Sequence, residues 1–202
     1  MPITKTLNNI GGISLSRDDD ERVMRDNHWV EAINKGDKKA FEAIYKCYYP
    51  QLFHFLMRYI DSDSTIEDII QNVFYKIWQN RTTIEPRGTL KSYLYASVRN
   101  QALKQIASEK KYSRAVSEAG EESCENGMDP ESSYELEELQ SAYQEAIQKL
   151  PERRRHIYLM NREDALTYNE IAGILKISVK TVETQMTRSL KFLATCLNKY
   201  RS

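Results

Sequence analysis

The feature that most constrains this chain is a helical spacing of apolar residues, which is clearest between residues 66 and 78. Large apolar side chains there are separated by alternating steps of three and one, the period of one buried face of an α-helix. No segment shows the strict alternation of a half-buried strand, and the chain has only seven Gly and five Pro. The sequence therefore predicts an all-α fold and argues against sandwiches and barrels.

Turn and capping residues divide this pattern into separate helices. Asp37 is expected to cap a helix whose apolar face includes Ile44, and Pro50 is expected to interrupt that helix. Ser64 and Glu67 have the spacing of a capping box for the helix over 66–80. A further helix is expected from about Leu90 to Lys110, and the helical period returns at Leu136.

Residues 109–135 lose the period and are rich in polar residues. This segment includes most of a strongly acidic stretch. Residues 115–140 contain nine acidic residues and no basic residue. Such a segment is typical of a flexible linker that is extended by its own charge. We therefore expect two small helical domains joined by an acidic flexible linker, the C-terminal one containing a helix-turn-helix. The predicted ranges are a flexible N-terminal extension over 1–25, domains over 26–108 and 136–202, and the linker over 109–135.

Basic residues gather on both sides of this acidic stretch, although the net charge of the chain is zero. Residues 76–114 contain nine basic and two acidic residues, and residues 141–202 contain eleven basic and six acidic residues. Basic blocks favour a polyanionic partner, but ordinary solvated surfaces would explain them equally well.

Sequence signals for catalysis are lacking. The chain has no Gly-rich phosphate loop and no nucleophile elbow, and its three His are isolated from one another and from the Cys. We therefore expect no enzymatic activity, no cofactor and no metal site. Cys47, Cys124 and Cys196 lie far apart, which is typical of free thiols in a reducing cytoplasm. No apolar run is long enough for membrane insertion.

The C-terminal block carries the most specific motif. Thr167 and Glu170 have capping-box spacing before a short helix, and Ser178 can cap a second helix after a tight turn. A short helix, a turn and a second helix with a basic outer face are typical of a DNA-binding helix-turn-helix, although an ordinary helical hairpin shares the outline. The residues expected to contact DNA are Arg153, Arg154, Ser178, Lys180, Thr181, Thr184, Gln185, Arg188 and Lys191.

Two further polar surfaces are predicted in the first domain. The helix over 66–80 has a mixed polar face that suits a protein partner, if it is not simply solvated, through Asp68, Gln71, Asn72 and Tyr75. The next helix interleaves cations with aromatic rings, which suits unpaired bases, unless Tyr93 belongs to the core. Its candidate contacts are Arg87, Lys91, Tyr93, Tyr95, Arg99, Asn100 and Lys104, of which Tyr95 and Arg99 are expected to point outward or sideways.

Four stretches of this chain together resemble the extracytoplasmic-function branch of the sigma-70 family. Residues 34–50 resemble the start of its domain 2, residues 67–81 its polymerase-clamp helix, and residues 90–106 the region that reads and opens the −10 element. Residues 150–193 resemble domain 4, which reads the −35 element, and the run from Val179 to Thr184 resembles Bacteroidetes members. Lys176 stands where the family usually has Gly or Asn at the turn, so it is expected to adopt a left-handed conformation.

The resemblance implies a sigma factor, which performs no reaction itself. Its expected partners are core RNA polymerase, through the β′ clamp and the β flap, promoter DNA, and an anti-sigma factor. The alternatives are a stand-alone helix-turn-helix regulator that needs no polymerase, and a helical adaptor or nucleic-acid enzyme. The first leaves the N-terminal domain unexplained, and the second requires a catalytic cluster that the sequence does not show.

Overall fold

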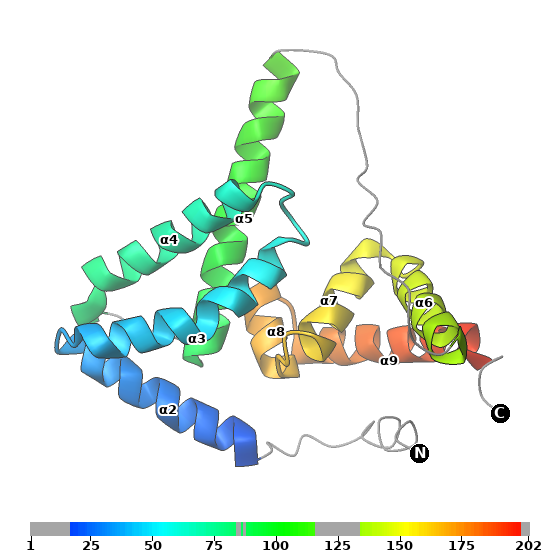
Figure 1. Ribbon diagram of the computed structural model, residues 1–202, viewed down its shortest axis with the longest axis horizontal. Coiled ribbons are helices and arrows are strands. Elements are labelled where there is room, and N and C mark those ends of the chain that lie inside the picture. The colour runs from blue at the N-terminus through cyan, green and yellow to red at the C-terminus, as the bar shows by residue number, and fades with distance from the viewer. Residues whose placement is uncertain (1–16, 84–85, 87, 116–133, 199–202) are drawn as a thin grey trace.

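The computed structural model describes residues 17–83, 86, 88–115 and 134–198, and these residues form helices and no strand (Figure 1). The first group comprises α2 (Arg17–Asn34), α3 (Lys38–Leu56), α4 (Asp63–Gln79), the short 3₁₀-helix η1 (Arg81–Thr83) and α5 (Leu90–Ala115). The second group comprises α6 (Tyr134–Gln148), α7 (Glu152–Arg162), α8 (Tyr168–Leu175) and α9 (Val179–Cys196). The predicted all-α class and two-domain arrangement are confirmed.

The core of the first group follows the predicted apolar spacing. α4 buries one stripe against α3 and α5, and that stripe consists of Ile66, Ile69, Ile70, Val73, Phe74 and Ile77. The ring of Phe74 meets Tyr45 edge-on, with ring centroids 4.9 Å apart. Because this stripe is fully used for packing, the opposite face of α4 is free to carry polar side chains.

Two local predictions in this group are wrong. α3 does not stop at Pro50 but continues to Leu56, because Leu52, Phe55 and Leu56 are buried beyond the proline and their burial outweighs the missing N–H. The cap of α4 is Ser62 rather than Ser64: the Thr65 N–H donates to the Ser62 hydroxyl at 3.3 Å. The predicted cap at Asp37 is confirmed, since its carboxylate accepts from the N–H groups of two following residues.

The helices at the ends of the first group run beyond the predicted boundaries. α2 begins at Arg17, so residues 17–25 are helical rather than a flexible extension, and Asp26 and Ile33 of this helix are buried. α5 continues past residue 108 to Ala115. The rest of the predicted extension, residues 1–16, and residues 116–133 of the predicted linker lie outside the described residues.

The second group is a smaller helical unit that packs around α9. α7 and α8 both contact α9, and α6 packs on it from another side. The core stripe of α9 consists of Val182, Met186 and Leu193, together with Ser189. Of the three Cys, Cys47 and Cys196 are free thiols, and Cys124 is outside the described residues. None of the described helices is long and apolar enough to cross a membrane.

Candidate functional site

The helix-turn-helix has the local geometry that its sequence predicts. The Thr167 N–H donates to the Glu170 carboxylate at 2.9 Å, and the Glu170 N–H donates to the Thr167 hydroxyl at 3.2 Å, so the capping box is complete. Lys176 ends α8 with φ 55°, which confirms the predicted left-handed turn. Ser178 then caps α9 by accepting from the Thr181 N–H at 3.1 Å. These contacts fix the angle at which α9 leaves the turn.

The outer face of α9 presents most of the predicted DNA contacts to solvent. Lys180, Thr184, Arg188 and Lys191 are exposed, and Thr181 and Gln185 are half-buried. On α7, Arg153 is exposed, whereas the Arg154 Nε atom donates to the Gln185 amide oxygen at 3.5 Å. The structure thus brings residues of α7 and α9 together on one basic surface. Arg and Gln side chains placed this way have the donors and acceptors that read guanine and adenine edges.

The polar face of α4 forms a second exposed surface. The predicted polymerase contacts on this face are all exposed: Asp68, Gln71, Asn72 and Tyr75. Tyr75 has the largest side chain of the four, and it is 59% exposed. The Gln79 amide donates to the Tyr75 hydroxyl at 2.5 Å. An exposed aromatic ring surrounded by polar groups is a frequent anchor of protein interfaces.

The predicted surface of α5 is divided by the structure. Asn100 and Lys104 are exposed, Tyr93 and Arg99 are half-buried, and Arg87 lies outside the described residues. The prediction that Tyr95 points outward is wrong: its side chain is 0% exposed and packs edge-on against Phe55, with ring centroids 4.9 Å apart. Lys91 is also buried, because its ammonium donates to two backbone carbonyls of the α7–α8 loop.

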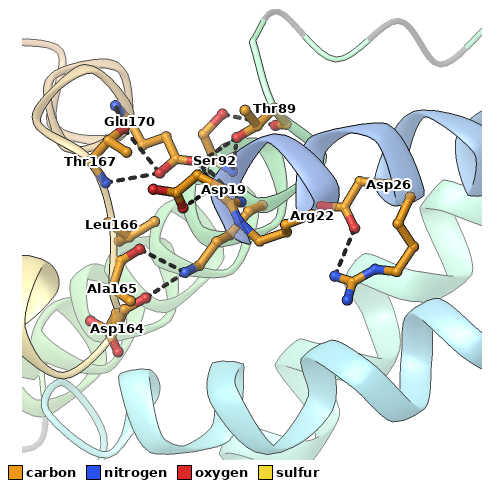
Figure 2. Close-up of polar contacts among 12 residues, drawn as sticks. Asp19, Arg22, Asp26, Thr89, Ser92, Asp164, Ala165, Leu166, Thr167 and Glu170 are labelled. Carbon is orange, nitrogen blue, oxygen red and sulfur yellow. Dashed lines mark hydrogen bonds and ion pairs between the residues drawn. The ribbon is translucent and has the colours of Figure 1, made fainter. Parts of the chain in front are cut away.

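Residues that the sequence analysis did not single out connect the two helical groups. Arg58, which follows α3, donates to Asp164 in the α7–α8 loop, and Arg22 of α2 donates to Glu170 of α8. Glu170 also accepts from the Thr89 hydroxyl at 2.6 Å (Figure 2). Of these residues, the sequence indicates a role only for Glu170, as a helix cap. The partners lie between 81 and 148 residues apart, so no local sequence pattern could reveal them.

Burial dominates the electrostatics of this contact region. It lowers the pKa of Lys91, and the nearby positive charge of Arg22 lowers it further. Burial also raises the pKa of Asp164, and the hydrogen bonds and charge of Arg58 offset only part of that effect. For Glu170 the balance is opposite: burial alone would raise the pKa, but hydrogen bonds from Thr89 and Thr167 and the charge of Arg22 lower it overall.

No group of three or more His, Cys, Asp or Glu among the described residues has the arrangement of a metal site. The candidate surfaces described above are exposed helix faces. Their chemistry is that of recognition: cations and amides on α9 and α5, and a mixed polar and aromatic face on α4.

Comparison with known proteins matches both helical groups to one family. Sigma-70 region 2 matches residues 44–112, and sigma-70 region 4 matches residues 140–193. The chain belongs to the extracytoplasmic-function branch of the sigma-70 family. The chain is 27% identical over 172 residues to the sigma factor SigW of Bacillus subtilis, and the match covers 81% of this chain and 92% of SigW. It is also 27% identical over 174 residues to the sigma-E factor of Escherichia coli K12, over 82% of this chain and 91% of that protein.

Two solved structures share the fold of this sigma factor. One is the sigma factor RpoE from Bartonella quintana in complex with the anti-sigma factor NepR, with a TM-score of 0.59, 19% identity and coverage of 79% of this chain and 98% of RpoE. The other is CnrH in complex with the cytosolic domain of CnrY, with a TM-score of 0.58, 18% identity and coverage of 87% and 98%. Sigma factors are transcription initiation factors and not enzymes.

Proposed function

We propose that this sigma factor binds core RNA polymerase through α4 and reads promoter DNA through α9 and α5. The observation that carries the proposal is that α4 and α9 present separate exposed polar faces on the two helical groups. A stand-alone regulator needs only the α9 face and gives no role to the exposed Asp68, Gln71, Asn72 and Tyr75. A factor that couples DNA to polymerase needs both faces.

At the −35 element, α9 enters the major groove and α7 lies beside the phosphate backbone. Arg188 and Gln185 are the candidates for base contacts, because a guanidinium can pair with guanine and an amide with adenine. Arg153 and Arg154 come from a different helix and are better placed for phosphates. The remaining predicted contacts, Ser178, Lys180, Thr181, Thr184 and Lys191, flank these residues on α9.

At the −10 element, α5 holds bases that have left the duplex. Asn100 and Lys104 are exposed and available for contact, and Arg99 and Tyr93 are half-buried beside them. Extruding a base costs a few kcal/mol, which contacts to the flipped base must offset. Lys91 can take part only if its ammonium leaves the two loop carbonyls that it contacts, and Tyr95 belongs to the core of the first group.

The relatives also suggest the other partners. One similar structure is the sigma factor RpoE in complex with the anti-sigma factor NepR, and we infer that this chain is likewise bound by an anti-sigma factor. Its polymerase contacts would be the β′ clamp for α4 and the β flap for the second domain. A factor that works on polymerase and promoter DNA acts in the cytoplasm.

Run-off transcription tests the proposal. Core polymerase is supplied with a promoter template in the presence or absence of the chain, and duplex binding by the chain alone is measured in parallel. We expect promoter-specific transcript only when the chain and core polymerase are both present, with weak DNA binding by the chain alone. Tight duplex binding without any polymerase-dependent transcript would instead identify a stand-alone regulator.

A further inference from the structure

The helix proposed to read the −35 element, α9, carries a single acidic residue, Glu183. The exposed basic residues of the same helix are Lys180, Arg188 and Lys191. Glu183 is exposed, and so are its neighbours one turn before and one turn after it, Lys180 and Thr187. A duplex that contacts Lys180 and the adjacent Thr184 therefore also meets the Glu183 carboxylate.

Stabilisation of the helix start does not account for Glu183. α9 has no acidic residue in its first turn, and its cap is Ser178, whose hydroxyl accepts from the Thr181 N–H at 3.1 Å. Glu183 is the fifth residue of α9. The favourable effect of a carboxylate on the helix dipole falls off within the first turn, so it does not reach this position.

The Glu183 carboxylate also has no partner on its own surface. No ion pair or hydrogen bond among the residues that the structure describes involves this side chain. The hydroxyls of Thr184 and Thr187 donate to the backbone carbonyls of Lys180 and Glu183, at 2.8 and 2.9 Å. These two donors are therefore directed at the backbone, and both carboxylate oxygens of Glu183 are available as acceptors.

An unpaired carboxylate weakens DNA binding unless a base supplies a donor. Duplex DNA carries one negative charge per about 1.7 Å of its axis, so the phosphates repel Glu183. In the major groove cytosine presents its N4 amino group as a donor, whereas guanine presents two acceptors and thymine an acceptor and a methyl group. Adenine has an amino group beside its N7 acceptor. Cytosine is thus the base whose major-groove edge best complements a carboxylate.

We propose that Glu183 is a specificity-determining residue that accepts a hydrogen bond from the N4 amino group of a cytosine in the −35 element. It favours cytosine at one position and disfavours guanine and thymine there, because their acceptors would face the carboxylate. Lys180, one turn earlier, can donate to a neighbouring phosphate or guanine. This inference rests on the proposed function, in which α9 enters the major groove, and adds a base that the cations and amides of α9 do not select.

Selection of promoter DNA by the holoenzyme tests this role. Core polymerase and the full-length chain are mixed with duplexes randomised over the promoter region, and the bound duplexes are sequenced. For the wild type we expect one −35 position at which cytosine is enriched about tenfold over guanine and thymine, within the range of one good base contact. Glu183→Gln should change the enriched base there to adenine, because an amide both accepts from N6 and donates to N7. Glu183→Ala should remove the preference and leave the other positions unchanged.

The matched control is Glu152→Gln, which makes the same chemical change at the exposed start of α7. Repulsion between a carboxylate and phosphates does not distinguish bases, so this variant should enrich the wild-type base at every position. The inference is overturned if Glu183→Gln and Glu183→Ala also enrich the wild-type bases throughout, since Glu183 would then be only a solvated charge. It is also overturned if the position that changes in these variants does not select cytosine in the wild type.

A second selection separates this inference from the proposed function. The same duplexes are presented to the full-length chain without polymerase at low salt, where phosphate contacts are strongest. If the chain alone selects a cytosine that Glu183→Gln exchanges for adenine, and core polymerase adds no further selection, the reading of a base by Glu183 is supported and the proposed coupling to polymerase is wrong. A wild type that enriches no sequence in either selection overturns both.

Discussion

Removal of one hydroxyl group should have opposite effects at two buried tyrosines. Tyr48 is 1% exposed and donates from its hydroxyl to the Asp26 carboxylate, whereas Tyr95 is 0% exposed and its hydroxyl has no partner among the described residues. We predict that Tyr48→Phe destabilises the protein and that Tyr95→Phe stabilises it. The chemical change is identical, so the difference reports only on hydrogen bonding.

The magnitudes follow from the partners. A hydrogen bond to a charged group contributes about 1.5–3 kcal/mol, so Tyr48→Phe should lower the free energy of unfolding by about that amount. At Tyr95, deletion removes a buried polar atom whose unmet hydrogen bond costs about 1–3 kcal/mol, and we expect a gain near the lower end, of about 1 kcal/mol. The ring of Tyr95 keeps its edge contact with Phe55, so little packing is lost.

Urea unfolding followed by circular dichroism measures the difference. The two variants should differ by at least about 2.5 kcal/mol in the free energy of unfolding, which is more than 1 M in urea midpoint at a slope of roughly 2 kcal/mol/M. Equal destabilisation by both substitutions would refute the reasoning, because it would mean that the Tyr95 hydroxyl has a partner in solution. An unchanged stability for Tyr48→Phe would refute the contribution of the Asp26 bond.

Three further outcomes are expected. The pKa of Glu170 in the folded protein lies below its ordinary value of 4.5. Its ionised form therefore stabilises the fold above pH 4.5, and this stabilisation is lost as the pH falls through the folded pKa. In Glu170→Gln the free energy of unfolding, measured by urea titration, should fall less steeply at acid pH than in the wild type. Arg188→Ala should weaken promoter binding of the holoenzyme by about 1–3 kcal/mol in a footprint titration if it reads a base, and should instead reduce the salt slope by about one if it contacts phosphate. Asp68→Arg combined with Gln71→Ala should reduce co-purification with core polymerase while circular dichroism shows an intact fold, and undiminished recovery of the folded variant would contradict the α4 surface.

Helices were predictable from the sequence because their signals are local. Alternating steps of three and one in α4 identified six buried residues, and the capping box at Thr167 and Glu170 marked the start of α8 within one residue. The left-handed conformation of Lys176 was expected from the family resemblance, because the family usually has Gly or Asn at that turn. The apolar spacing and the capping box depend on neighbours within one or two helical turns.

Helix ends were less predictable, because several residues compete for each one. Ser62 and Ser64 both have a hydroxyl that can cap a helix. Ser62 is the cap in the structure, because its hydroxyl accepts from the Thr65 N–H. Pro50 looked like a break because its ring removes one hydrogen bond, but the buried residues that follow it keep α3 continuous. Tertiary burial decided a question that local propensity had answered wrongly.

The errors on α5 have a different origin. The stripe of Leu94 and Val98 predicts that Tyr95 points outward or sideways, but Tyr95 packs on Phe55 of α3 within the first group. Lys91, a predicted DNA contact, is buried because the α7–α8 loop covers it. This loop belongs to the other half of the chain, and the ion pair of Arg58 and Asp164 spans 106 residues. Nothing within a helical window encodes such a contact.

The first domain extends beyond the residues that the sigma-70 region 2 match covers. The sigma-70 region 2 match begins at residue 44, yet α2 places Ile33 in the core and supplies Asp26 to the buried hydroxyl of Tyr48. The Arg25 guanidinium pairs with Asp26 at 3.1 Å and lies 4.6 Å from the centre of the Trp29 ring, so the Asp26 carboxylate is bound from both α2 and α3. We infer that the first domain begins with α2. The region 2 match therefore covers only part of the folding unit, because α2 lies before it and still contributes Ile33 to the core.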